Sequence, residues 1–564
     1  MSDNPRGGST LPNGERLAAL GDAVERRGAP AATTRRRRKP PRRRRWLRRS
    51  IIAAGLVVVL IVGAVVGDYY YLGSLIHHQK VTHLQTIGAT ENILLIGSTN
   101  RCALKVQNKA YGLCSQGVTG INSDITMILH LDPATKTVSL LSIPRDLFVP
   151  NARLEGANKI DAALYEGPSQ LVSAIEEDFA IPINHYVELN FDTFANVVNA
   201  LGGVYLYFPI PVFDAESGLN IERKGCYLLD GYHALQVVRA RHLQIQPNPS
   251  NHNPHTWPQE ALSDLARIRR THEFLRVLAA KVAARGIGNP LTDQSILAAV
   301  LPNLTVDNSF GESEMLHLAE TFAHTSIANV PQATYPVVSV QTGSLLYQGY
   351  YYGEVEFPLQ PTGVSVVNQI FGVKPGTYSF TGKPLPPARG VRVSVENGTN
   401  VASMGPLVAR GLSQHGFTVT ATTNVTPDGP VAETVVWYGG PKPPDNGNWV
   451  SPDQAAAQSV LDQLEGPAIL GYNPAKVTPG DQVTVEAGTS ASVKPLGSSS
   501  SGTHRSHGTT TTRPGAATTT TTIYDPASVR ANGSFSSPSS VSPSLAPWDP
   551  RACTPAQQAT ATRN

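Results

Sequence analysis

The chain has 564 residues, of which 41% are hydrophobic and 16% are charged, and its formal net charge is +4. This length leaves room for two or three domains with sizeable cores, and the low charged fraction argues against a chain that is soluble throughout. Residues 1–50 carry 15 Lys or Arg and 4 Asp or Glu, a net charge of +11, so the remaining residues carry −7. The basic character is therefore a local feature and not a property of the folded part.

The first element is expected to be a transmembrane helix over residues 51–72, after a disordered basic cytoplasmic segment over residues 1–50. Ile51–Gly67 contains no charged residue, and after Asp68 the aromatic segment Tyr69–Leu72 extends the span. About 20 residues of helix cross a hydrocarbon core of roughly 30 Å. Because arginines before a span hold that end in the cytoplasm, we expect a single-pass protein of the cell membrane whose domains lie outside the cytoplasm.

Three other interpretations of this N-terminal region are weaker. A buried core helix over the apolar segment would not need the cluster of arginines beside it. A cleavable signal peptide is disfavoured because the basic lead is too long and no small-residue cleavage site follows it. A nucleic-acid-binding arm is unnecessary because the adjacent apolar span explains the same arginines. We therefore expect the membrane as a partner, and no nucleic acid.

Four cysteines fit an exported chain. Cys102 and Cys114 bracket a short loop, and a disulfide between them is our prediction; it would stabilise the fold by about 2–3 kcal/mol. Cys226 and Cys553 are far apart, and the sequence gives no basis for pairing them. The cysteine spacing does not match a zinc site.

Apolar strands and helical patterns alternate after an expected linker over residues 73–90. Alternation of this kind predicts an α/β fold, here a domain over residues 91–330. Predicted strands lie at 92–97, 125–131, 137–143, 186–189 and 204–208, and predicted helices at 168–179, 192–201, 229–241 and 263–285.

A second, smaller α/β domain is expected over residues 389–487, where strand and helix patterns alternate again. Residues 331–388 are expected to form a connector that packs on one or both domains. Residues 488–564 are rich in Ser, Thr and Pro and predict a disordered tail.

The sequence holds no G-x-S-x-G, H-E-x-x-H or P-loop motif. The remaining candidates for a functional site are several arginines in apolar surroundings. Arg145 follows a predicted strand, and Arg239 and Arg241 share one side of a cleft only if their helix ends there. Arg267 and Arg270 are three residues apart and can share a helix face. Buried guanidinium groups need anions, and a pyrophosphate offers oxygens that match arginine's planar fork. The alternative is that each arginine forms an ordinary ion pair or extends to the surface.

Five ordered motifs between about residues 90 and 285 resemble the LytR-CpsA-Psr family of cell-wall glycopolymer transferases, and residues 389–487 resemble the LytR C-terminal domain. The motifs are SDITMILHLDPATKTVSLLSIPRDLFV (123–149), KIDAAL (159–164), HYVELNFDTFANVVNALGGV (185–204), LDGYHALQVVRARH (229–242) and DLARIRRTHEFL (264–275).

The resemblance implies a three-layer α/β/α extracytoplasmic domain and a phosphotransferase. Such enzymes move a glycopolymer from a polyprenyl-pyrophosphate carrier onto a peptidoglycan hydroxyl through a phosphodiester bond. Asp124, Arg145 and Arg241 are the implied catalytic residues, and Asp124 would bind Mg²⁺ or help to activate the acceptor, while Asp146 would orient Arg145 or its neighbours. The implied pyrophosphate ligands are Arg145, Lys159, Arg239, Arg241, Arg267 and Arg270.

Three departures from the family pattern matter. Thr99 replaces the usual second metal-binding Asp, so metal binding would rest on Asp124, phosphate oxygens and water. Thr271 replaces a usual Gln, and an insertion over Gln244–Glu260 is expected to lengthen the mouth of the site. A non-catalytic scaffold that binds the lipid pyrophosphate, or a pyrophosphatase acting on it, therefore stays open.

Overall fold

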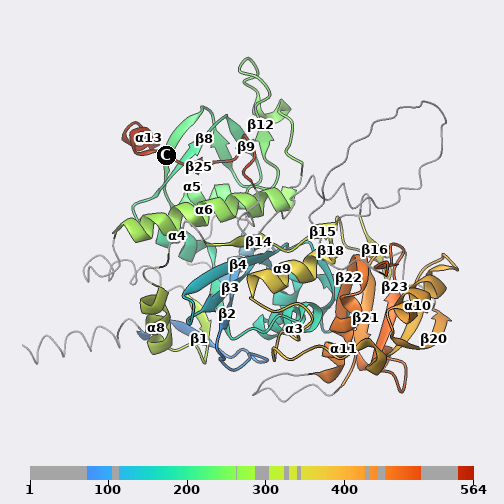
Figure 1. Cartoon of the computed structure of the whole chain (residues 1–564). Helices are drawn as coiled ribbons and strands as arrows, with labels where there is room; N and C mark the ends of the chain where they lie inside the picture. The colour runs from blue at the N-terminus through green and yellow to red at the C-terminus, as the bar shows by residue number, and fades with distance from the viewer. Residues whose placement is uncertain are drawn as a thin grey trace, which may run out of the picture. The chain divides into compact units, whose positions relative to one another are not determined.

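The computed structural model describes residues 71, 73–103, 113–117, 119–261, 263–285, 304–322, 325, 330–338, 344–425, 432–440, 451–496 and 544–563. Contacts divide the chain into residues 1–71 and 72–564, and all that follows concerns the second unit (Figure 1). The predicted cytoplasmic segment and nearly all of the predicted transmembrane helix over residues 51–72 lie outside the described residues. Among the residues that are described, none of the helices combines the length and apolarity that crossing a membrane requires.

A seven-stranded mixed sheet forms the centre of the first domain, in the order β1-β13-β7-β2-β3-β4-β14. The strands predicted over residues 125–131 and 137–143 are present as β3 and β4, which pair antiparallel as a hairpin. Its turn follows from local chemistry, because the Asp132 side chain accepts hydrogen bonds from the backbone N–H groups of Ala134 and Thr135. The strands are β1 His77–Gln79, β2 Glu91–Ser98, β3 Ser123–Asp132, β4 Thr137–Ile143, β7 His185–Leu189, β13 Thr305–Asp307 and β14 Gln332–Thr334.

Helices cover both faces of this sheet, which gives a mixed α/β fold. The helix α3 (Pro168–Phe179) packs its apolar face on Leu94, Ile96 and other buried residues of one face. The opposite face contacts α8 (Glu312–Phe322) and α6 (Ser263–Arg285), whose His272 hydrogen-bonds Ser142 of β4.

The helix α5, which carries Arg239, shares a buried apolar cluster with α4, α6 and the strands of two small sheets. Asp230 caps α5 by accepting a hydrogen bond from the His233 backbone N–H. A Cβ at Gly231 would lie 2.2 Å from the Ala195 carbonyl oxygen, so only glycine lets α4 and α5 approach this closely. The elements here are α4 Phe191–Ala200, α5 Gly231–Arg239, β8 Val204–Phe208, β9 Val212–Asp214, β10 Leu219–Ile221, β11 Gly225–Leu229 and β12 Gln244–Ile245.

The predicted connector over residues 331–388 contributes strands to both domains. Its first strand, β14, joins the central sheet beside β4, whereas β15 and β18 extend the sheet of the C-terminal domain. The elements of the C-terminal domain and the connector are β15 Val337–Val338, β16 Leu346–Tyr347, β17 Tyr350–Tyr351, β18 Phe357–Gln360, α9 Thr362–Ile370, β19 Arg392–Asn397, α10 Met404–Gln414, β20 Thr418–Asn424, β21 Thr434–Tyr438, α11 Pro452–Leu461, β22 Leu464–Tyr472, β23 Val483–Ala487 and β24 Ser492–Val493.

The prediction of a disordered tail over residues 488–564 is wrong at both ends of that range. Residues 488–496 include β24, and residues 544–563 fold onto the first domain, where β25 (Arg551–Ala552) pairs with β8 and β26 (Thr562–Arg563) pairs with β11. Figure 1 shows α13 (Pro555–Ala559) and β25 beside β8. A disulfide joins Cys553 to Cys226, 327 residues earlier. The disorder prediction rested on the average composition of residues 488–564, which is rich in Ser, Thr and Pro. The last residues of that range differ from the average, since they include a tryptophan and a cysteine.

Candidate functional site

Thr99, Asp124 and Arg145 meet at one edge of the central sheet because of strand direction. β2 and β3 are antiparallel, so the end of β2 lies beside the start of β3, with Ser98 opposite Ser123. β3 and β4 are also antiparallel, so the end of β4 lies at the same edge, with Ile143 opposite Thr126. Thr99 directly follows β2, Asp124 is the second residue of β3, and Arg145 comes two residues after β4, so the three residues converge.

Two helices bring further arginines to this edge. α5 ends at Arg239, and the next residue, Ala240, has extended backbone angles (φ −61°, ψ 117°), so Arg239 and Arg241 both reach the same cavity. This is the helix end on which their convergence depended. Arg267 comes from the first turns of α6. The cavity has a volume of about 280 Å³ and is lined by Thr99, Arg101, Gly120, Asn122, Asp124, Arg145, Glu216, Ser217, Arg239, Arg241, His242 and Arg267.

The side chains that line this cavity include more cations than anions. Five of the lining side chains are guanidinium groups and two are carboxylates, Asp124 and Glu216. The Glu216 side chain is 73% exposed, so solvent screens its charge. Although Arg145, Arg241 and Arg267 also pair with carboxylates, the lining presents mainly guanidinium groups to a ligand and therefore favours an anion.

Arg145 is held by carboxylates on three sides. It forms ion pairs with Asp124 and with Asp161, the latter at 3.1 Å, and its Nε lies 3.8 Å from Asp146. Although burial alone would lower the pKa of Arg145, Asp124 and the other carboxylates raise it above its ordinary value. Burial raises the pKa of Asp161 to about 6. Arg145 is thus permanently charged at the floor of the cavity.

Asp146 positions two cations of the site. Its Oδ2 accepts from Arg241 at 2.7 Å, and its Oδ1 accepts from Lys159 Nζ at 2.8 Å. Burial opposes ionisation, but Arg241 and the neighbouring cations lower the pKa of Asp146. Lys159 does not line the cavity, so its expected contact with pyrophosphate is replaced by this ion pair with Asp146.

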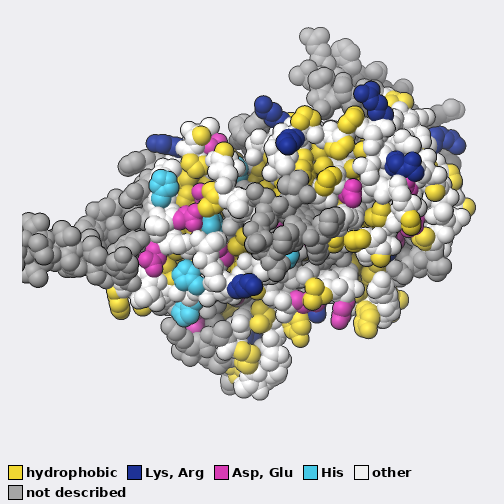
Figure 2. Space-filling model, turned by 90° about the horizontal axis from the view of Figure 1, so that it is seen from below, with side chains coloured by type: hydrophobic (Ala, Val, Ile, Leu, Met, Phe, Trp, Pro, Cys, Tyr) yellow, Lys and Arg dark blue, Asp and Glu magenta, His cyan; other side chains and the backbone are white. Residues whose placement is uncertain are grey.

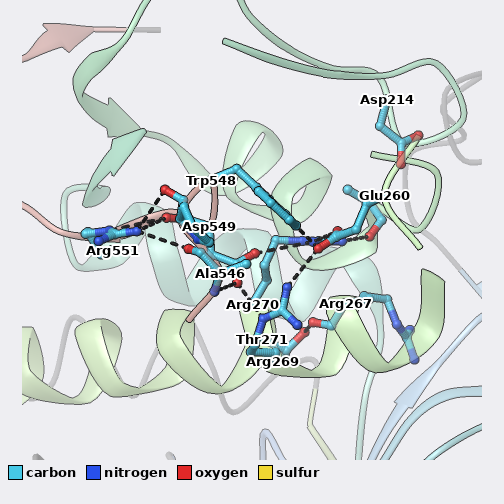
Figure 3. A network of polar contacts seen from close by, with 12 residues as sticks. Asp214, Glu260, Arg267, Arg269, Arg270, Thr271, Ala546, Trp548, Asp549 and Arg551 are labelled. Carbon is cyan, nitrogen blue, oxygen red and sulfur yellow. Dashed lines mark hydrogen bonds and ion pairs between the residues drawn. The ribbon is translucent and has the colours of Figure 1, made fainter. Parts of the chain in front are cut away.

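Arg267 and Arg270 face different partners, although both lie on α6. Arg267 lines the cavity and pairs with the buried Asp264 at 2.9 Å. Arg270 is 1% exposed, pairs with Glu260 and donates to the Ala240 carbonyl at 2.7 Å. In Figure 3 the Arg267 side chain points away from the cluster that holds Arg270. The prediction that Arg270 binds pyrophosphate is therefore wrong, because Glu260 captures its guanidinium.

Glu260 is the last residue of the predicted insertion, and its partners tie the C-terminal segment to α6. Its Oε1 accepts from Arg269 and from the indole N–H of Trp548, each at 2.7 Å. Asp549 is fully buried and pairs with Arg269 and Arg270 (Figure 3). Part of the insertion thus supports the helix behind Arg267.

Thr99 is engaged by backbone groups. Its hydroxyl accepts from the Asn122 N–H at 3.0 Å and lies 3.3 Å from the carbonyl oxygens of Gly120 and Asn122. It therefore fixes the loop before β3 and leaves Asp124 as the carboxylate at this edge that could bind a cation. The nearby Cys102 and Cys114 are joined in a disulfide, with Cα atoms 5.1 Å apart.

Three acidic residues of the site were missed from the sequence. Asp161 and Asp264 lie inside the quoted motifs, so their positions beside arginines offered a signal. Glu356 offered none, since it lies in the connector and reaches Asp146 through backbone hydrogen bonding. Burial and the nearby Asp264 and Asp146 carboxylates raise the pKa of Glu356 to about 8.

Apolar side chains approach the cavity at Arg239. Its guanidinium lies 4.9 Å from the centre of the Phe191 ring. Phe191 belongs to the buried apolar cluster between α4, α5, α6 and β8.

The sequence model of the LytR_cpsA_psr family matches residues 73–357, half of the chain. The chain belongs to the LytR-CpsA-Psr family. A second model, LytR_C, described as LytR cell envelope-related transcriptional attenuator, matches residues 390–490. The first match extends past the predicted end of the domain at residue 330 and includes Glu356.

Relatives of this LytR-CpsA-Psr protein include "Probable cell wall biosynthesis protein LcpB" of Corynebacterium glutamicum, 33% identical over 41% of this chain and 51% of the relative. "Polyisoprenyl-teichoic acid--peptidoglycan teichoic acid transferase TagV" of Bacillus subtilis is 36% identical over 21% of this chain and 32% of the relative. The matches thus span about half and about a third of these two relatives. The solved LytR-Csp2A-Psr enzyme from Actinomyces oris is 22% identical, with a TM-score of 0.38, over 47% of this chain and 88% of that one.

Proposed function

We propose that this LytR-CpsA-Psr protein transfers a glycopolymer from a polyprenyl-pyrophosphate carrier to a hydroxyl group of peptidoglycan. The observation that carries the proposal is the cavity with five guanidinium groups at the edge of the central sheet. Arg145, Arg241 and Arg267 also pair with carboxylates, so the two phosphates of a pyrophosphate would balance only the remaining positive charge, while their several oxygen atoms accept from the guanidinium groups in pairs. Family membership and the teichoic acid transferase relative from Bacillus subtilis support the same reaction class.

In the proposed reaction the acceptor hydroxyl oxygen attacks the phosphorus that carries the glycan. A new P–O bond forms, the P–O–P bond breaks, and polyprenyl phosphate leaves. Arg145, Arg239, Arg241 and Arg267 bind the phosphoryl oxygens and stabilise the charge that develops on them. Asp124 lies at the same edge of the sheet and can accept the proton of the acceptor hydroxyl.

The residues also fit Mg²⁺ as a cofactor. Mg²⁺ is often bound by one or two carboxylates together with substrate phosphates and water, and Asp124 supplies one carboxylate beside the arginines. When bound, the ion would neutralise charge on the pyrophosphate. Because the Thr99 hydroxyl is committed to the backbone, Asp124 would be the main protein ligand.

The proposed location is the outer side of the cell membrane. The apolar segment over residues 51–72 would span the bilayer with its arginine-rich side in the cytoplasm. All four cysteines form disulfides, which supports an oxidising compartment outside the cytoplasm for the folded domains. The helices on both faces of the central sheet support the three-layer α/β/α arrangement implied by the family.

The test is a transfer assay with the purified full-length chain. The protein is incubated in detergent with a lipid-pyrophosphate-linked sugar, Mg²⁺ and peptidoglycan oligomers, and both lipid phosphate and wall-linked sugar are measured. Arg145→Ala should abolish both products, whereas Arg276→Ala, which removes an arginine on α6 outside the cavity, should retain them.

Each other outcome has a defined meaning. Lipid phosphate without wall-linked sugar indicates a pyrophosphatase, and bound lipid without either product indicates a scaffold. Full transfer by Arg145→Ala would refute the assignment of the cavity.

A further inference from the structure

A second cluster of polar side chains lies at the opposite end of β2 from the arginine cavity. Glu91 is the first residue of β2 and Ser98 is the last, so a strand rise of about 3.3 Å per residue separates the two ends by roughly 23 Å. His185 begins the neighbouring strand β7, and Glu314 lies in the first turn of α8. One ligand atom from each of Glu91, His185 and Glu314 lies within 4.8 Å of the other two.

His185 is oriented by a carboxylate behind it. Its side chain is 1% exposed, and Nδ1 lies 3.2 Å from Oδ2 of Asp307. Asp307 is itself fixed, because the same oxygen accepts from the Tyr186 N–H at 2.9 Å. An acceptor at Nδ1 favours the tautomer with the proton on that nitrogen, so the Nε2 lone pair faces the cluster.

The cluster offers acceptors without a matching donor. His185 Nε2 is buried, makes no hydrogen bond, and lies 3.5 Å from Glu314 Oε2. Glu91 is 7% exposed, and its Oε2 is also buried without a hydrogen bond. An ion pair between His185 and Glu314 would still leave the Glu91 oxygen without a hydrogen bond. A cation between the three groups satisfies all of them.

We propose that Glu91, His185 and Glu314 bind a divalent transition metal ion, with Zn²⁺ as the best fit. One imidazole nitrogen and two carboxylates leave a fourth position for water. A further carboxylate that orients the ligating histidine, here Asp307, is a recurrent feature of zinc sites. The imidazole disfavours Mg²⁺ and Ca²⁺, which prefer oxygen ligands.

The ion would connect β2, β7 and α8, and so it would fasten α8 to the sheet. His317, one turn after Glu314, also acts electrostatically on Glu91 and opposes the burial that raises the pKa of its carboxyl. Figure 2 shows histidine and acidic side chains gathered on this face over the region of α8 and β1. The site is independent of the arginine cavity, because it shares no residue with the cavity lining.

The test is zinc titration by isothermal calorimetry of the chelator-treated full-length chain, with Mg²⁺ in excess to occupy sites for hard cations. We expect one Zn²⁺ per chain with a dissociation constant in the micromolar range or below. Glu314→Gln, at a side chain that is 24% exposed, should weaken binding at least tenfold. Glu312→Gln, two residues earlier on the same helix, should bind like the natural chain.

X-ray absorption of zinc bound to the natural chain gives a second readout that does not depend on a variant. We expect one imidazole nitrogen and two or more oxygen ligands. Two or more imidazoles would place the ion among surface histidines and overturn the proposal. Equal zinc affinity in Glu314→Gln, or no binding by the natural chain at millimolar Zn²⁺, would overturn it as well.

Discussion

Replacing Asp549 by alanine is expected to loosen the C-terminal segment from α6. Asp549 and Glu260 together balance the charges of Arg269 and Arg270, and the Asp549 and Arg270 side chains are 0% and 1% exposed. The substitution leaves one buried positive charge without its partner. Breaking a buried ion pair in this way costs about 3–5 kcal/mol.

Hydrogen exchange measured by mass spectrometry on the disulfide-bonded protein is the suitable assay. Since about 1.4 kcal/mol corresponds to a factor of ten, protection of the amides in residues 549–553 should fall by two to nearly four orders of magnitude. Arg392→Ala is the control, because the Arg392 side chain is 56% exposed and its ion pair with Asp481 lies in the C-terminal domain; about 0–1 kcal/mol is expected for such a pair. Unchanged protection in Asp549→Ala, or an equal loss in the control, would refute the reasoning.

Three further predictions concern the site. Glu356→Gln should remove a pH dependence of the free energy of unfolding. The natural carboxyl has a pKa raised from about 4.5 to about 8, so unfolding releases its proton between these pH values. The free energy of unfolding of the natural chain therefore falls as pH rises through this range, by at most about 5 kcal/mol, and urea unfolding at pH 5 and pH 9 checks this. Arg241→Lys keeps the charge but loses the planar fork, and losing a charge-assisted hydrogen bond of about 1.5–3 kcal/mol should lower kcat/KM in the transfer assay by roughly 10–150-fold. Lys159 lies outside the cavity lining and pairs with Asp146, so kcat/KM of Lys159→Ala should fall less than tenfold. A loss as complete as that expected for Arg145→Ala would show direct contact with substrate.

The convergence at the sheet edge was predictable because it is local. Asp124 and Arg145 belong to one hairpin, and strand direction alone brings the ends of β2 and β4 to the start of β3. The helix was predicted to run to residue 241, but α5 ends two residues earlier, at Arg239; a helix end near these residues is the condition under which two arginines in alternate positions share a cavity. Short-range periodicity and strand order carry this information.

The partner of Arg270, the position of Glu356 and the second disulfide depend on contacts between residues far apart in the sequence, which local sequence patterns do not encode. Helical spacing allowed Arg267 and Arg270 to share a face, but the choice of partner for Arg270 is made by Glu260 and Asp549, which approach from outside the helix. Glu356 reaches the site from the connector, and Cys553 reaches Cys226 across 327 residues. Contacts between such distant residues produce no periodic pattern of apolar residues in the sequence. The average composition of a long segment does not reveal them either.

The bond between Cys226 and Cys553 changes what cleavage of the intervening chain would do. A protease that cuts between residues 497 and 543 would not release the last residues as a free peptide, because the disulfide and the strands β25 and β26 keep them attached to β8 and β11. The two pieces would separate only under reducing and denaturing conditions. A label fused after the final residue would accordingly report on the neighbourhood of β11, and it would stay with the first domain after such a cut.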